Sequence, residues 1–201
     1  MELALGASLD ELGESLGDVD GAGTTAAALD QFLREVEARA FRIAVLGIRD
    51  RDEALDVVQD AMIRLVRGYA HVPSAEWPPL FYRILINRIR DWQRRRTVRR
   101  RVLAFFGTND EGEEQDPLQS APGPADDDPA EHAARHQALA ALEDALARLP
   151  ERQREAFVLR NLEGLDVADT AAAMQCSEGS VKTHYFRAVQ RLRELLGEHW
   201  G

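Results

Sequence analysis

The sequence predicts an all-α protein made of two small helical domains joined by a flexible acidic linker, the C-terminal domain being a helix-turn-helix. On both sides of residues 107–131, apolar residues recur at the three- and four-residue spacing of amphipathic helices, and no stretch alternates as a half-buried strand does. Residues 107–131 are rich in Gly, Pro and acidic residues, and their few large apolar side chains do not offset the entropy cost of ordering the chain.

Composition sets the boundaries of four segments. Residues 1–25 are an acidic extension that we expect to be disordered, 26–106 a first helical domain, 107–131 the linker and 132–201 a second helical domain. A chain of 201 residues has room for two such domains, each with a modest core.

Charge is distributed unevenly along the chain. Residues 1–25 carry six acidic and no basic residues, and residues 107–131 carry nine acidic and none basic. The rest of the chain is therefore basic although the whole has a net charge of −10, and residues 83–101 hold nine arginines against one aspartate. A nucleic-acid partner is compatible with this distribution.

The first domain is expected to begin with two helices. One covers residues 29–48 and starts near Asp30, and the next covers residues 52–69 and starts at Asp50 or Asp52. The second helix has a predicted core stripe of Leu55, Val58, Met62, Leu65 and Val66. Its outward face carries Asp56, Gln59 and Asp60.

A connector over residues 70–79 precedes the third helix, and we expect Pro78 and Pro79 to keep it non-helical. The helix over residues 80–96 then places Phe81, Leu85, Ile89 and Trp92 on the core side, and Arg83, Asn87, Arg90 and Arg94 on the other side. Trp77, in the connector, is the aromatic residue expected to be free to stack on an unpaired base.

The second domain is predicted to contain helices over residues 130–149, 150–164 and 166–175, followed by a helix that Ser177 caps. The last helix has a core face of Val181, Tyr185, Ala188, Leu192 and Leu195. Its outer face carries Lys182, Thr183, Phe186, Arg187 and Gln190. A short helix, a turn and a helix with a polar free face form the helix-turn-helix pattern of DNA-binding proteins.

Three motifs in order resemble the extracytoplasmic-function (group IV) sigma factors of bacterial RNA polymerase. ALDVVQDAMIRL is similar to a helix of that family's region 2, and FYRILINRIRDWQRRR is similar to its arginine-rich helix. LPERQREAFVLRNLEGLDVADTAAAMQCSEGSVKTHYFRAVQRLREL resembles its C-terminal helix-turn-helix, region 4.

The resemblance implies an alternative sigma factor that binds core RNA polymerase and promoter DNA, helps to melt the DNA, and is held by an anti-sigma factor. Region 2 (26–106) would use Asp56, Gln59 and Asp60 on the polymerase, and region 4 (132–201) would read the minus-35 element. The implied minus-10 residues are Trp77, Arg83, Asn87, Arg90 and Arg94.

The side-chain chemistry of the last helix agrees with base reading. Lys182, Thr183 and Arg187 offer hydrogen-bonding groups to base edges, and Phe186 offers a surface for the thymine methyl group. The backbone N–H groups of Gly179 and Ser180 stand at the start of the helix, where a phosphate is bound favourably.

Other classes of protein fit less well. A regulator of the response-regulator type, the main alternative, needs a strand-and-helix receiver domain, and an enzyme needs a set of catalytic partners that the scattered histidines and acids do not form. No cofactor or metal site is expected, since Cys176 is the one cysteine and His132 with His136 lack a third ligand. Without a signal peptide or membrane-spanning segment, the expected location is cytoplasmic.

Overall fold

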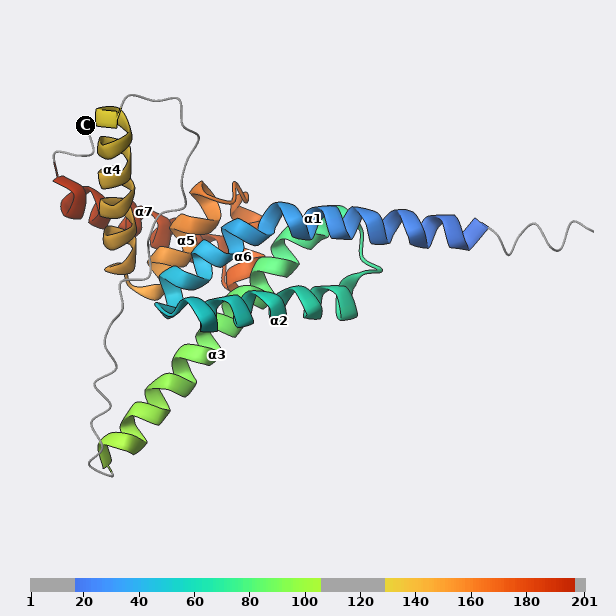
Figure 1. Cartoon of the computed structure of the whole chain (residues 1–201), viewed down its shortest axis with the longest axis horizontal. Coiled ribbons are helices and arrows are strands. Elements are labelled where there is room, and N and C mark those ends of the chain that lie inside the picture. The colour runs from blue at the N-terminus through green and yellow to red at the C-terminus, as the bar shows by residue number, and fades with distance from the viewer. Residues whose placement is uncertain (1–16, 106–128, 198–201) are drawn as a thin grey trace, which may run out of the picture.

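The computed structural model describes residues 17–105 and 129–197, and the regular structure in these two ranges is entirely helical, which confirms the all-α prediction. The helices are α1 (Gly17–Ile48), α2 (Arg51–Tyr69), a short 3₁₀ helix η1 (Ser74–Glu76), α3 (Trp77–Phe105), α4 (Pro129–Ala147), α5 (Glu151–Asn161), α6 (Val167–Met174) and α7 (Glu178–Leu196). Helices α1 and α3 are the longest, and one end of each projects away from the other helices (Figure 1). Within the described ranges, no helix has the length and apolar character needed to cross a membrane.

Helix α1 begins earlier than predicted. It starts at Gly17 rather than near Asp30, so the expectation of disorder is wrong for residues 17–25. The acidic residues suggested a disordered tail, but the run of alanines from Ala26 to Ala28 has the highest helix propensity and joins the segment to the amphipathic part of α1. Residues 1–16 and 106–128, the latter including most of the predicted linker, lie outside the described residues, and residues 129–131 begin α4.

Asp50 starts α2, as one of the two predicted alternatives. Arg49 adopts a left-handed conformation (φ 58°) that ends α1, and the Asp50 carboxylate then accepts hydrogen bonds of 3.1 Å from the backbone N–H groups of Asp52 and Glu53. A side-chain acceptor at this position satisfies N–H groups that the first turn of a helix leaves free.

The buried face of α2 differs from the predicted stripe. Val58 and Leu65 are buried, but Leu55 and Val66 are exposed, and Ala54 and Ala61 take their places in the core. The predicted stripe was chosen from large aliphatic residues only. The buried face is instead rotated about the helix axis towards the two alanines, whose small side chains let α2 approach its neighbours closely.

The connector is shorter than predicted, because α3 already begins at Trp77 and includes Pro78 and Pro79 in its first turn. Proline is tolerated there, since the N–H groups of the first turn have no partner within the helix. Trp77 and Phe81 are therefore four residues apart on one helix face, and both are buried beside Phe32, with ring centroids 5.9 and 6.0 Å from that ring.

The described core continues from α1–α3 into the C-terminal helices. Leu159 of α5 and Met174 of α6 are buried in the same cluster as Phe81. A second cluster joins Leu46 of α1 to buried residues of α4, α5 and α7. The N-terminal and C-terminal groups of helices thus lie against each other in this structure.

Candidate nucleic-acid interface

A tight turn joins α6 to α7. Helix α6 ends at Gln175, which adopts a left-handed conformation (φ 54°) and donates its backbone N–H to the carbonyls of Ala171 and Ala172. The Ser177 hydroxyl accepts a hydrogen bond from the backbone N–H of Ser180 at 3.2 Å, which confirms the predicted cap of α7. Since the cap uses the Ser180 N–H, that group is not free for a phosphate as the sequence suggested.

The core face of α7 is the predicted one. Val181, Ala188 and Leu192 are buried, and Leu195 is partly buried. The Tyr185 ring stacks on Phe157 of α5 with centroids 6.3 Å apart. These contacts fix the rotation of α7 about its own axis, so its opposite face is presented in one orientation.

That opposite face is exposed, as predicted. Phe186 keeps 63% of its surface accessible, and Lys182, Thr183 and Arg187 are exposed beside it. The Thr183 hydroxyl donates to the backbone carbonyl of Gly179 at 2.9 Å. The face therefore combines cationic groups, a hydroxyl and an apolar ring, the groups that contact base edges in a major groove.

Two polar contacts hold α6 and α7 in place against α5. The Tyr185 hydroxyl lies 3.1 Å from the side-chain oxygen of Asn161, at the end of α5. Arg152 Nη1 donates to the backbone carbonyl of Met174 at 2.9 Å, which holds the end of α6 against α5. Partial burial lowers the pKa of His184, and the charges of Arg152 and Arg187 lower it further.

The structure does not bring the predicted minus-10 residues together as one free surface. Arg94 is exposed and lies 3.6 Å from Asp91, and Asn87 is partly buried. The Arg83 guanidinium lies over the Tyr69 ring, 5.9 Å from its centroid. Arg90 is bound elsewhere, to the C-terminal helices.

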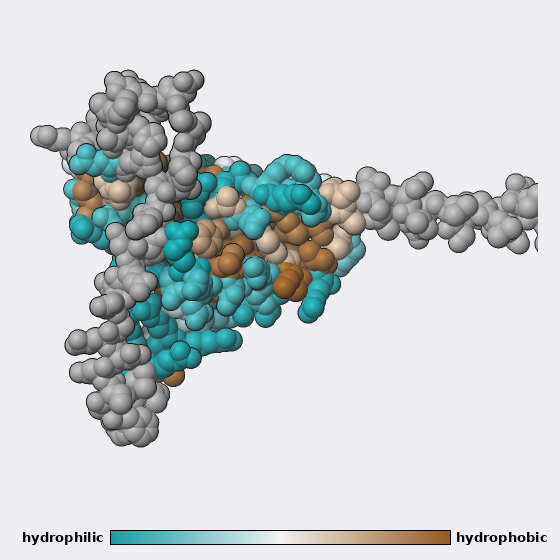
Figure 2. Space-filling view, in the orientation of Figure 1, coloured by the Kyte–Doolittle hydropathy of each residue, from teal (hydrophilic) through white to brown (hydrophobic). Residues whose placement is uncertain are grey.

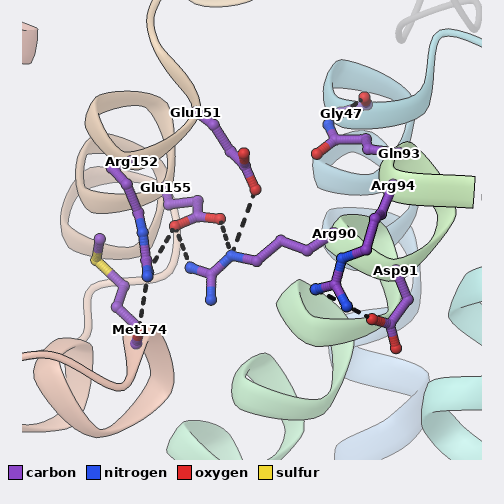
Figure 3. Close-up of polar contacts among 9 residues, drawn as sticks. All are labelled: Gly47, Arg90, Asp91, Gln93, Arg94, Glu151, Arg152, Glu155 and Met174. Carbon is purple, nitrogen blue, oxygen red and sulfur yellow. Dashed lines mark hydrogen bonds and ion pairs between the residues drawn. The ribbon is translucent and has the colours of Figure 1, made fainter. Parts of the chain in front are cut away.

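Arg90 holds a carboxylate of α5 in a two-pronged contact (Figure 3). Its Nε donates to Glu155 Oε1 at 2.9 Å and its Nη2 to Glu155 Oε2 at 2.5 Å, and Nε lies 3.3 Å from Glu151 Oε1. Burial raises the pKa of the Glu155 carboxyl above its usual range, and the Arg90 guanidinium opposes that rise. Sequence reasoning missed this contact, because the partners are 65 positions apart and no local pattern pairs them.

Trp77 is a correction to the sequence prediction. It was expected to be free for base stacking, but the structure buries it to 2% exposure against Phe32, because α3 begins at Trp77 and turns this residue towards the core. Its indole N–H has no hydrogen-bond partner among the described residues.

The three polar residues predicted to face the polymerase differ in their surroundings. Asp56 and Gln59 are exposed on α2. Asp60 is partly buried and forms ion pairs with Arg64, at 3.0 Å, and with Arg88 of α3. Asp60 therefore contributes to joining α2 and α3.

An exposed apolar stripe, missed from the sequence, runs along α2 beside these polar residues. Leu55, Ile63 and Val66 are 42%, 48% and 44% exposed. Together with Gln59 they are spaced by three or four residues and so share one face of the helix. Figure 2 shows hydrophobic residues gathered among hydrophilic ones over the part of the molecule formed by α1 and α2.

Comparison with known proteins identifies the family. The family model described as sigma-70, region 4, matches residues 139–192, which include α5, α6 and most of α7. The ECF RNA polymerase sigma factor SigM of Mycobacterium tuberculosis is 32% identical over 171 residues, covering 85% of this chain and 78% of SigM. The chain belongs to the ECF sigma factors. The RNA polymerase sigma-E factor of Streptomyces coelicolor is also similar to this sigma factor, with 30% identity over 83% of this chain and 85% of that protein.

Solved structures agree with this assignment. The sigma factor RpoE from Bartonella quintana, solved in complex with the anti-sigma factor NepR, matches 84% of this sigma factor and 98% of that chain, with a TM-score of 0.58 and 26% identity. CnrH, solved in complex with the cytosolic domain of CnrY, matches 87% of this sigma factor and 94% of that chain with a TM-score of 0.54; at 22% identity it supports the fold alone.

Family membership decides between the function classes weighed from the sequence. The chain is an alternative sigma factor that acts with RNA polymerase and promoter DNA in transcription initiation, and a response-regulator type of protein is not favoured. The relatives named above are themselves sigma factors.

Proposed function

We propose that this sigma factor reads the minus-35 element of its promoters with the exposed face of α7. The observation that supports this role is the face itself: Lys182, Phe186 and Arg187 are exposed together on a helix whose rotation is fixed by its buried side. Helix-turn-helix proteins insert the N-terminal part of such a helix into the major groove. Residues 132–201 act as region 4 in this proposal.

Replacing Arg187 with Ala tests this assignment. Loss of a base contact should weaken promoter binding by about 1–3 kcal/mol and relax the preference at one base pair of the upstream element. Arg193→Ala is the matched control, because Arg193 is also exposed on α7 but lies about 9 Å further along the helix axis. A loss of equal size on every sequence would show that Arg187 contacts phosphate alone.

Residues 26–106 act as region 2 in this proposal, with two separate surfaces. Helix α3 approaches the minus-10 element through Arg83, Asn87, Arg90 and Arg94. Trp77 is not included, because its ring is buried. The positive charge of the arginines attracts the phosphate backbone of single-stranded DNA.

Helix α2 forms the surface for core polymerase in this proposal. Asp56 and Gln59 lie beside the exposed Leu55, Ile63 and Val66, and apolar groups ringed by polar ones are typical of protein-binding surfaces. Ile63→Asp should abolish co-purification with core polymerase at unchanged thermal stability. Leu139→Asp, at a similarly exposed apolar residue of α4, should not, and equal co-purification of both variants would contradict the assignment.

The same α2 surface is proposed to bind an anti-sigma factor when the sigma factor is inactive. The similarity to RpoE, which was solved with the anti-sigma factor NepR, supports this partner. Competition between a cognate anti-sigma factor and core polymerase tests the shared surface, and simultaneous binding of both would contradict it.

We further propose that the chain works in the cytoplasm and has no enzymatic activity of its own.

A further inference from the structure

The exposed face of α7 contains the only lysine of the chain. Of the 25 residues that are lysine or arginine, Lys182 is the one lysine and all the others are arginines. The two side chains differ in reactivity, because an amine can lose its proton and attack a carbonyl carbon, whereas the guanidinium of arginine keeps its proton in proteins. Acyl transfer to basic side chains therefore has one target in this protein.

The Lys182 amine is accessible from the solvent. Its side chain is 66% exposed, and its Nζ lies 3.9 Å from Oε2 of Glu178, one turn earlier in α7. The Glu178 side chain is itself 56% exposed, and an ion pair of this length between two exposed groups is weak and does not cover the amine. Lys182 thus combines the chemistry and the accessibility that acylation needs.

Acylation at this position changes the exposed face of α7 in two ways. An amide in place of the ammonium group removes one positive charge and two of the three N–H donors that Lys182 offers to DNA. It also leaves the Glu178 carboxylate without its cationic neighbour, and that carboxylate then repels the phosphates of DNA. No second lysine shares the effect, so modification of one atom is sufficient.

We propose that Lys182 is an acylation site, and that transfer of an acetyl group from an acyl phosphate or an acyl thioester switches off promoter reading. The unprotonated Nζ attacks the acyl carbon and forms an N–C bond. The bond from that carbon to oxygen or sulfur breaks, the phosphate or thiolate leaves with the electron pair, and the proton left on nitrogen passes to water. The inference rests on the proposed role of α7 at the minus-35 element.

Promoter binding and acylation exclude each other in this arrangement. A helix face that lies in a major groove is covered by DNA, so the Lys182 amine is accessible only in chains that are not bound to a promoter. An acylated chain has then lost a cation and a set of donors that the groove requires. Acylation therefore acts on the pool of free sigma factor.

Treatment of the free, full-length chain with acetyl donors tests the site. The chain, prepared without any added lysine, is incubated in parallel with acetyl phosphate and with acetyl-coenzyme A, and mass spectrometry of its peptides locates the acetyl groups. We expect acetylation of Lys182 by at least one of the two donors. An unmodified Lys182 with both donors, under conditions that acetylate the α-amino group of the chain, would overturn the proposal.

Promoter binding is measured after the donor is removed and core polymerase is added. Acetylation should raise the dissociation constant for a minus-35 duplex by about fivefold or more. Lys182→Arg should have the same dissociation constant before and after treatment, because the guanidinium is not acylated. Equal affinity of the treated and untreated wild-type chain would overturn the proposal.

Moving the lysine along α7 separates a local effect from a general loss of charge. Lys182→Arg combined with Arg193→Lys shifts the one lysine about 16 Å along the helix axis, to a position that is also exposed. Acetylation of this variant should leave its promoter affinity unchanged, and a loss as large as in the wild-type chain would overturn the proposal. If Arg187→Ala binds promoter DNA as the wild-type chain does, the proposed function fails instead, whatever acetylation does.

Discussion

Replacing Phe186 with Ala removes the apolar ring from the exposed face of α7. A phenylalanine side chain offers roughly 200 Å², and because Phe186 is 63% exposed, about 125 Å² is available to DNA. At about 25 cal/mol per Å², burial of half to all of this area contributes about 1.5–3 kcal/mol. The dissociation constant for a minus-35 duplex should therefore rise by about tenfold to about a hundredfold.

The assay is fluorescence anisotropy of the polymerase–sigma complex on a labelled minus-35 duplex, repeated with deoxyuridine in place of thymidine. If the ring contacts a thymine methyl group, wild type should lose affinity on the deoxyuridine duplex, and Phe186→Ala should lose little more. Leu162→Ala is the control, because Leu162 is an exposed apolar residue at the end of α5, outside the reading face. Wild-type affinity in Phe186→Ala would refute the assignment.

Further predictions concern the packing and the charge of the interior. A Cβ at Gly47 would lie 2.7 Å from Ile89 Cγ2, so Gly47→Ala should lower the melting temperature. Overpacking costs about 1–3 kcal/mol. This cost exceeds the gain of about 0.5–1 kcal/mol that alanine brings over glycine inside a helix. Gly68→Ala, where nothing lies within 4 Å, should raise the melting temperature, and the same sign for both variants would contradict this reading. Burial raises the pKa of Glu163 above its ordinary 4.5, so the stability that this group contributes is complete below that value and is lost as pH rises through the raised pKa. As the pH rises above 4.5, Glu163→Gln should therefore lose less unfolding free energy than wild type in denaturant titrations, and an identical pH dependence would count against this explanation.

The sequence was sufficient for α7 because its local signals agree. A serine cap starts the helix, large apolar residues at helical spacing mark one side, and the remaining positions are polar apart from Phe186. The exposed side could therefore be assigned residue by residue.

Elsewhere the deciding information was not local. The buried side of α2 depends on Ala54 and Ala61, whose role follows from how closely α1 and α3 approach. Trp77 is buried because α3 starts before its prolines, although the usual effect of proline is to exclude helix. The Arg90–Glu155 pair joins helices that are distant in sequence, and charge spacing along one helix could not predict it.

Run-off transcription with purified core RNA polymerase is the most direct test of the central claim that this chain is a promoter-selective sigma factor. We expect discrete transcripts that need both the core enzyme and this chain, and that disappear when the upstream promoter element is altered. No promoter-dependent RNA on any template from the source genome, together with no binding to core polymerase, would contradict it.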